Sequence, residues 1–364
     1  MSFAFGEHLH AAFAPPRYLA LPFSGIDIST SGVKAVRLAE DARGLTLASY
    51  AEARLSSGAF TDGEIVDQAA IIEALSTAAR EADISSVNAA LPESKSFLFE
   101  TAATGVTKVE WRTAVEQHLD ELIPLPPQET DFDLVEVGKN NNGALVTGIG
   151  FAQRIVDDTL AVFDEAHISL RELEGETFAM ARALLPKGDK STALIIDIGK
   201  TTTKISIVAE RIPRFATTIG IGGHALTLAV QKYFGVTETE ARKVKSERGI
   251  VSAVGNEEYL AAMLSTVSAI RDEISLRLDY WQGKVLPNGT HELVTHAILS
   301  GGNASVLGLP EYLEGALKIP VVLGDVFTNL ASRDKWVPSL DYTESLAYAT
   351  AIGLALYDHT QPYA

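Results

Sequence analysis

Two short stretches of this sequence place an aspartate between an apolar run and a hydroxyl-rich turn. Asp27 lies in the first stretch and Asp197 in the second, and each is followed seven residues later by a lysine, Lys34 or Lys204. A carboxylate at the end of a buried strand suits a hydrated magnesium ion, which prefers one or two carboxylates together with phosphate oxygens. We therefore expect both aspartates to hold Mg²⁺ through water.

The turn between each aspartate and its lysine can bind an anion through hydroxyl and backbone N–H groups. Gly199 allows the second turn to be tight. We expect phosphate contacts from Ser29, Thr30, Ser31 and Lys34 in the first stretch, and from Gly199, Lys200, Thr201, Thr202 and Lys204 in the second.

The two stretches also match each other. Aligning Asp27 with Asp197 aligns Lys34 with Lys204, which indicates an internal duplication whose halves face each other across a nucleotide. Either stretch alone would be weak evidence, since an aspartate at the end of a strand is often only a turn residue.

Glycine pairs in the second half of the chain provide further candidates for ligand contact. Gly301 and Gly302 follow an apolar strand and precede Asn303, so the backbone there can pass close to a flat ligand. A glycine pair is also commonly a simple turn. Gly222 and Gly223 lead into a helix, and we include them among the residues expected to bind the cofactor.

Composition narrows the classes of function. The 364 residues suffice for two α/β lobes, and the net charge of −17 argues against nucleic acid and against unaided binding to anionic lipid. The absence of cysteine excludes disulfides, thiol catalysis and thiolate metal sites and is compatible with the cytoplasm, and the eight histidines show no metal-ligand spacing. No apolar run reaches the length of a transmembrane helix.

Hydrophobic periodicity predicts an α/β protein. Strands are expected at 23–28, 33–38, 45–51, 87–91, 131–138, 144–151, 193–198, 204–208, 214–219, 296–300 and 319–323. Helices are expected at 64–82, 110–122, 155–165, 170–185, 223–234, 237–249, 257–281, 312–317 and 344–356. Asparagine and glycine at 139–143 predict a hairpin turn, and 286–289 end a segment.

These features resemble the actin-like ATPase superfamily. The aspartate hairpins are similar to its two phosphate motifs, and Gly301-Gly302 to its adenosine motif. The best resemblance is to the PilM family of type IV pilus assembly, with FtsA as a related family. It is carried by 25–34, 123–126 with 131–133, 176–179, 221–223, 240–245, 273–280, 300–304, 309–313, 319–321 and 348–354.

The resemblance implies a two-lobed actin-like fold of duplicated ribonuclease-H-like lobes, with a small α+β insertion in the first lobe. The expected division is an N-terminal tail or helix at 1–20; the first lobe at 21–95 and 169–190; the insertion at 96–168; the second lobe at 191–225 and 291–345; its outer subdomain at 226–290; and a C-terminal helix at 346–364, returning to the first lobe.

The resemblance also implies ATP and Mg²⁺ as cofactors and assigns roles to two more residues. Glu176 precedes a small-residue helix, as does a family glutamate near the attacking water; a surface glutamate is the alternative. Lys245 matches a lysine of the nucleoside pocket, although a lysine on a charged helix is usually solvated. Arg242 replaces the family's glutamate and Ser29 its glycine, so we expect at most a slow ATPase.

A partner is implied as well. Members of the family bind the cytoplasmic N-terminal tail of a PilN-like inner-membrane protein, and we expect 104–110 and 131–137 to lie at that contact. The protein would then be cytoplasmic and reach the membrane only indirectly, with self-association as a further possibility. An FtsA-like cell-division filament protein and a small-molecule kinase of the same superfamily are the alternatives.

Overall fold

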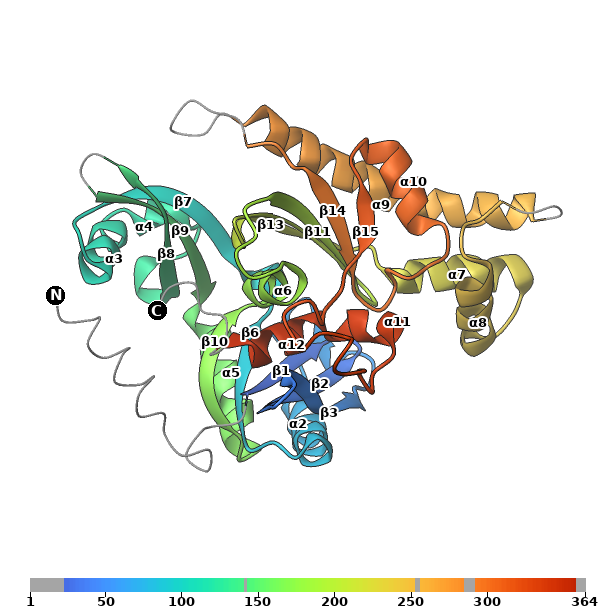
Figure 1. Ribbon diagram of the computed structural model, residues 1–364, viewed down its shortest axis with the longest axis horizontal. Helices are drawn as coiled ribbons and strands as arrows, with labels where there is room; N and C mark the ends of the chain where they lie inside the picture. Colours follow the sequence, from blue (N-terminus) through green and yellow to red (C-terminus); the bar gives the residue numbers. More distant parts are fainter. Residues whose placement is uncertain (1–22, 141–142, 253–255, 285–291, 358–364) are drawn as a thin grey trace.

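Both aspartate hairpins form, and each lies within a five-stranded sheet (Figure 1). The computed structural model describes residues 23–140, 143–252, 256–284 and 292–357. The expected tail at 1–20, the centre of the turn at 139–143, the segment end at 286–289 and the last residues of the expected C-terminal helix, from 358, lie outside the described residues.

The first sheet has the order β10-β6-β1-β2-β3. Its antiparallel part comprises β1 (Phe23–Ser29), β2 (Gly32–Asp41) and β3 (Gly44–Arg54), and β6 (Ser86–Leu91) and β10 (Ser169–Gly175) extend it with parallel pairing. A small separate hairpin is formed by β4 (Phe60–Thr61) and β5 (Glu64–Ile65). The helix α2 (Gln68–Ala82) packs against β2 and β3.

The second sheet repeats this arrangement in the order β13-β12-β11-β14-β15. Its strands are β11 (Thr192–Ile198), β12 (Thr203–Ala209), β13 (Ile212–Ile219), β14 (His296–Ser300) and β15 (Val321–Leu323). Again three antiparallel strands are followed by two parallel ones. The apolar run of β11 is completely buried, as expected for a strand covered on both faces. The structure thus confirms a duplicated α/β architecture.

Four helices of the second half share one buried core with the second sheet. They are α7 (Gly223–Phe234), α8 (Glu238–Arg248), α9 (Glu257–Gly283) and α10 (Leu309–Leu317). One stripe of α9, from Tyr259 to Trp281, is buried in this core. A capping box begins α8: Thr237 Oγ1 accepts from the Glu240 N–H, and the Glu240 carboxylate accepts from the Thr237 N–H.

Two short helices join the sheets into one core. They are α6 (Glu176–Leu184) and α12 (Ala349–Ala355), which lie between the sheets in Figure 1. A single buried cluster contains Val36 of β2, Met180 of α6, Ile195 of β11 and Ile352 of α12. Since this cluster contains residues of both sheets, apolar packing holds the two lobes together.

A smaller unit lies at one end of the molecule (Figure 1). It contains β7 (Phe97–Thr104), α3 (Lys108–Glu116), α4 (Leu119–Leu122), β8 (Thr130–Asn140) and β9 (Gly143–Ala152), with sheet order β7-β9-β8, and α5 (Gln153–Glu165) follows it. It has its own buried cluster around Val115 and Val146. Glu100 of β7 pairs with Arg214 of β13, and at 3.1 Å with Lys284, so this unit also touches the second lobe.

Several predicted boundaries were wrong. Residues 170–175, expected in a helix, form β10, because pairing with β6 across a bulge outweighs their helical spacing. The helix expected at 64–82 begins at Gln68, where Asp67 caps it, and 64–65 are a strand. The helix at 110–122 is two helices, α3 and α4.

The last helix is also divided. Residues 342–355 form α11 (Tyr342–Ser345), a 3-10 turn η4 (Leu346–Tyr348) and α12. Two further 3-10 turns are η2 (Glu93–Lys95) and η3 (Pro127–Glu129). The turn η4 carries the chain past β14, since Leu346 O accepts from Ser300 Oγ and Gly301 N.

Helix α12 packs at backbone distance against its neighbours. A Cβ added to Gly353 would lie 1.8 Å from Ala179 O of α6, and one added to Gly25 of β1 would lie 2.2 Å from Ala351 O. We predict that Gly353→Ala lowers the free energy of unfolding by about 1–3 kcal/mol, as overpacking of a dense core does. Thermal unfolding followed by circular dichroism measures this.

Gly315→Ala is the matched control. It also lies inside a helix, α10, but nothing is within 4 Å of its added Cβ. This change should leave stability equal or raise it by about 0.5–1 kcal/mol. Equal midpoints for Gly353→Ala and the wild type would contradict the close packing.

Candidate functional site

A cleft of about 840 Å³ lies between the two sheets and is lined by both aspartate hairpins. It brings together most of the residues expected to bind a cofactor. Those on its wall are Asp27, Ser29, Thr30, Ser31, Lys34, Glu176, Asp197, Gly199, Lys200, Thr202, Lys204, Gly223, Lys245, Gly301, Gly302 and Asn303. Thr201 and Gly222 are not on the wall, although Thr201 Oγ1 lies 3.1 Å from Thr30 Oγ1 of the opposite hairpin.

The two hairpins are related by register as the alignment predicts. Asp27 pairs with Lys34 across β1 and β2, and Asp197 pairs with Lys204 across β11 and β12. In each hairpin, therefore, the aspartate and the lysine are cross-strand neighbours. The backbone positions of the aspartate and the lysine therefore correspond on the two sides of the cleft.

The first turn is held by its own hydroxyl groups. Ser29 Oγ donates to Gly32 O at 3.0 Å and lies 2.9 Å from Ser31 Oγ. Lys34 Nζ donates to Ser31 Oγ at 2.9 Å and lies 3.6 Å from Glu52. A ligand at this turn would meet a preformed hydroxyl and ammonium surface.

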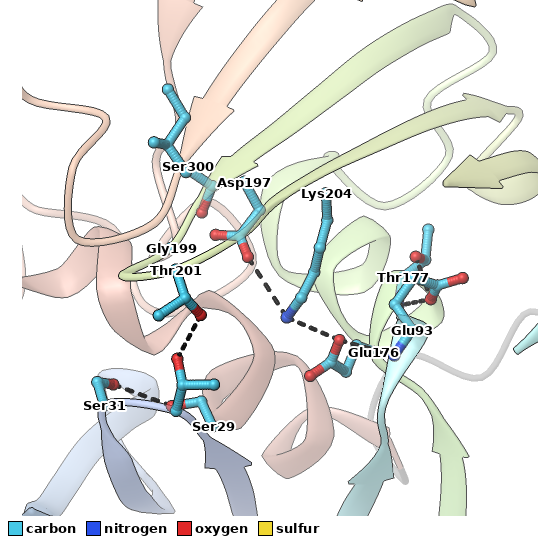
Figure 2. A network of polar contacts seen from close by, with 12 residues as sticks. Ser29, Ser31, Glu93, Glu176, Thr177, Asp197, Gly199, Thr201, Lys204 and Ser300 are labelled. Atoms are coloured by element: carbon cyan, nitrogen blue, oxygen red, sulfur yellow. Dashed lines mark hydrogen bonds and ion pairs between the residues drawn. The ribbon is translucent and has the colours of Figure 1, made fainter. Parts of the chain in front are cut away.

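The second lysine crosses the cleft. Lys204 Nζ lies 2.7 Å from Glu176 Oε2, at the start of α6, and 3.6 Å from Asp197 Oδ2 (Figure 2). Burial alone would lower the pKa of Lys204, but Glu176, Asp197 and Asp27 together raise it. The ammonium therefore stays charged and links the two halves of the site.

The aspartates are held in a desolvated, acidic environment. Burial, followed by repulsion from Glu176, raises the pKa of Asp27 to about 6, although Lys204 and Lys34 oppose the shift. Burial also raises the pKa of Asp197, against attraction from Lys204. Both carboxylates would gain from a cation placed between them.

A second polar network lies where α7 and α8 meet the turn after β14. Lys245 Nζ donates to Asn303 Oδ1 at 2.7 Å and to Gly223 O and Thr227 Oγ1 at 3.1 Å each. Burial, with repulsion from Arg242, lowers the pKa of Lys245 to about 8. Lys245 is thus not on a solvated face, whereas Arg242 pairs with Glu238 at 2.6 Å at the rim.

The glycine pair after β14 has two different environments. Gly301 has φ of +90°, and a Cβ there would lie 2.5 Å from Asp197 Oδ1, so this glycine makes room for the aspartate. A Cβ on Gly302 would have only ordinary contact with Ala347. Gly302 is accordingly the member of the pair that can lie against a ligand.

The residues present fit a magnesium–phosphate ligand. Three buried polar atoms of the cleft lack a hydrogen-bond partner among the described residues: Asp27 Oδ1, Thr218 Oγ1 and His224 Nδ1. Within the same residues, no cluster of three or more acidic, histidine or cysteine side chains could hold a metal on its own. A site with one or two carboxylates that relies on water and phosphate oxygens suits Mg²⁺.

Sequence reasoning missed many of the residues that line the cleft, including Glu52, Glu93, Thr218 and His224. Glu93 and Glu52 lie outside both hairpins, and nothing in their local pattern distinguishes them from surface carboxylates. Thr218 lies two residues before the glycine-rich segment 220–223 and His224 directly after it, and this proximity was the only local signal.

The repeated sheets and the cleft between them define a two-lobed protein of the actin-like class. The structure of MreB5 of Spiroplasma citri bound to ADP has a TM-score of 0.56 at 15% identity, covering 94% of this chain and 97% of that one. EutJ from Carboxydothermus hydrogenoformans has a TM-score of 0.54 at 17% identity, covering 94% and 90%. These similarities support the fold.

Residues 25–359 match the family described as Type IV pilus assembly protein PilM. The chain belongs to this family of actin-like pilus assembly proteins. The structure titled PilM-PilN type IV pilus biogenesis complex has a TM-score of 0.76 at 19% identity, covering 93% of this chain and 98% of that one. The predicted membership is confirmed.

Two curated relatives are cell division proteins named FtsA. That of Borreliella burgdorferi is 21% identical over 259 residues, which are 65% of this chain and 59% of its own length. That of Rhizobium meliloti is 25% identical over 216 residues, or 53% and 47%. The chain thus spans about half the length of these curated relatives.

The raised pKa of Asp27 predicts how stability depends on pH. Between pH 4 and 6 the Asp27 carboxyl is ionised in the unfolded protein but still protonated in the folded protein. Folding therefore becomes less favourable through this group as the pH rises over that range. Above pH 6 the penalty is about 3 kcal/mol. Asp27→Asn should therefore raise the unfolding midpoint clearly at pH 7.5 and less at pH 5.

Thermal scans of the ligand-free protein at both pH values make this comparison. Asp157→Asn, on the exposed face of α5, is the control and should change neither midpoint appreciably. A gain for Asp27→Asn that is the same at both pH values would contradict the assignment.

Proposed function

We propose that this protein binds Mg·ATP in the cleft and serves as an ATP-binding scaffold in type IV pilus assembly. The observation that carries the proposal is the pair of aspartate hairpins with matching Asp–Lys registers facing one cleft. The orphaned oxygen of Asp27 supports it, because a hydrated cation would satisfy that atom. The ADP-bound state of MreB5, which shares the fold, is consistent with it.

The residues divide into three groups by their place in the cleft. Asp27 and Asp197 would hold Mg²⁺ through water, and the ion would neutralise phosphate charge. The hydroxyl-rich turns at 29–31 and 199–202 would contact the phosphates. Gly302, with Asn303 and Lys245 beside it, would face the nucleoside, since a Cβ at Gly302 would have only ordinary contact with Ala347 and the backbone can lie against a flat ligand.

Removal of one carboxylate tests the metal-dependent part of the site. We predict that Asp197→Asn weakens Mg·ATP binding by at least about tenfold, a loss of about 1.4 kcal/mol, because the remaining Asp27 cannot replace both carboxylates. Isothermal titration calorimetry with and without Mg²⁺ measures it.

Asp279→Asn, on the exposed side of α9, serves as the control and should bind Mg·ATP as the wild type does. If Asp197→Asn binds Mg·ATP with unchanged affinity, the cleft is not the magnesium site.

We further propose that the insertion at 96–168 docks the cytoplasmic N-terminal tail of a PilN-like membrane protein. The PilM-PilN complex, whose fold this chain shares, is consistent with such a partner. In the present structure, β8 is an edge strand of the three-stranded sheet, to which an extended peptide could add. Val106 and Val109 beside α3 are 85% and 75% exposed and fall in the expected region 104–110.

Such a partner would account for membrane association. Across the described residues, no helix has the length and apolar character needed to cross a bilayer. With a net charge of −17, direct adsorption to anionic lipid is unfavourable. We therefore place the protein in the cytoplasm at the inner membrane, held there by the partner.

A charge on the exposed valines should disrupt docking. We predict that Val106→Asp with Val109→Asp weakens binding of a synthetic PilN-like N-terminal peptide by at least about tenfold, because charged groups would be desolvated. Val337→Asp, at an equally exposed valine outside the insertion, should bind normally. Fluorescence anisotropy measures the affinities.

Liposome flotation completes the test. The protein should float with anionic vesicles only when these carry the PilN-like protein. Flotation of the protein alone, or normal peptide binding by the double variant, would contradict the proposal. Altered sedimentation of the double variant without loss of peptide binding would assign the surface to self-association instead.

A further inference from the structure

Glu93 is a buried carboxylate of the cleft to which no role has been given. It begins the turn η2, is 4% exposed and lies on the cleft wall. Its Oε1 accepts from Ser96 Oγ at 2.5 Å, and its Oε2 accepts from Thr177 Oγ1 at 2.5 Å and from Thr177 N at 3.2 Å. Both oxygens are thus satisfied within the protein.

The contacts between Glu93 and the start of α6 are reciprocal (Figure 2). The Glu93 carboxylate accepts from the N–H of Thr177, the second residue of α6, which has no partner inside the helix. In return the Glu93 N–H donates to Glu176 Oε2 at 3.0 Å. The side chain and the backbone of one residue therefore hold two successive residues of α6.

This arrangement orients the Glu176 carboxylate. Its Oε2 is occupied by the Glu93 N–H and by Lys204 Nζ, and these are its contacts within the described part of the chain. Oε1 is the oxygen left to face the cleft, whose wall includes Glu176. Glu176 is 3% exposed, so these contacts, rather than solvent, determine the direction of its side chain.

Glu93 does not act as an acid or a base itself. The hydroxyl groups of Ser96 and Thr177 and the Thr177 N–H donate hydrogen bonds that stabilise the ionised Glu93 carboxylate. Burial and the nearby Glu176 nevertheless raise the pKa of Glu93. Both of its oxygens already accept hydrogen bonds from within the protein, three in all. Keeping such a group buried is unfavourable unless its hydrogen bonds are complete, and here they are.

We propose that Glu93 is a positioning residue for Glu176, which it holds so that Oε1 can accept a proton from a water attacking the terminal phosphate of bound ATP. The water oxygen forms a bond to the γ-phosphorus, and the bond to the β–γ bridging oxygen breaks. ADP leaves with that electron pair, and the water proton passes through Glu176 to solvent. This inference rests on the proposed binding of Mg·ATP.

Substitutions at Glu93 separate positioning from binding. Glu93→Ala should slow single-turnover hydrolysis of Mg·ATP by at least about tenfold, within the range that a misplaced general base loses. The Kd for Mg·ATP should change by less than about threefold, because Glu93 has no direct ligand contact. Glu93→Gln keeps the shape and an acceptor for the Thr177 N–H, so it should lose less.

Two further variants complete the design. In the double variant Glu93→Ala/Glu176→Gln, hydrolysis should be no slower than in Glu176→Gln, because Glu93 acts through Glu176. Lys95→Gln is the matched control: Lys95 lies on the same turn but pairs with Glu64 at 2.8 Å near the surface. It should hydrolyse and bind Mg·ATP as the wild type does.

A binding measurement covers the case of very slow turnover. The complex of ADP, Mg²⁺ and aluminium fluoride imitates the attacked phosphate, and calorimetry should show it at least about tenfold weaker in Glu93→Ala than in the wild type. If Glu93→Ala does not fold, Glu93→Gln decides, with a slower rate and unchanged Kd expected.

Three results would overturn the inference. The first is a Glu93 variant with the hydrolysis rate and the aluminium fluoride affinity of the wild type. The second is a double variant whose loss of rate is the product of the losses of the two single variants. The third is a wild type that neither hydrolyses ATP nor binds the aluminium fluoride complex more tightly than ADP. In the last case, Mg·ATP binding by the wild type would still support the proposed function. Absence of that binding would remove both.

Discussion

The Lys204 ammonium is the group on which the centre of the molecule depends. Asp27, Glu176 and Asp197 come from three elements, and their carboxylates would repel one another because all three are largely buried. Lys204 lies within 2.7 Å of Glu176 and 3.6 Å of Asp197 and compensates them. Removing one partner of such a buried set leaves uncompensated charge, which commonly destabilises by about 3–5 kcal/mol. The polar faces of the lobes are therefore linked to each other even without a ligand.

The hairpins and the duplicated sheets could be predicted from the sequence, because their signals are local. Asp27 and Asp197 are each followed seven residues later by a lysine, and a hairpin turns that spacing into cross-strand pairing. The repeat then predicts a second sheet built like the first. Most of the expected ligand residues line one cleft for the same reason, because they lie at the ends of strands that face the space between the two sheets.

What could not be predicted depends on contacts between distant segments. Residues 170–175 have spacing compatible with a helix, and only pairing with β6 makes them a strand. The sequence around Glu93 does not distinguish it from other loop glutamates, because its contacts are made with α6, which begins 83 residues later in the chain. The local pattern around Lys245 is that of a surface lysine, and only the family resemblance indicated a place in the cleft, because its burial depends on Asn303, which lies 58 residues away.

Helix α12 has a consequence for the order in which the chain can fold during synthesis. Its residues are completely or almost completely buried against β1 and α6, with Gly353 and Gly25 at backbone contact. Strand β1 leaves the ribosome more than 300 residues before the helix that covers it. Until α12 has been synthesised, the first sheet therefore lacks the helix that covers one of its faces. Chaperones bind exposed apolar surface of this kind.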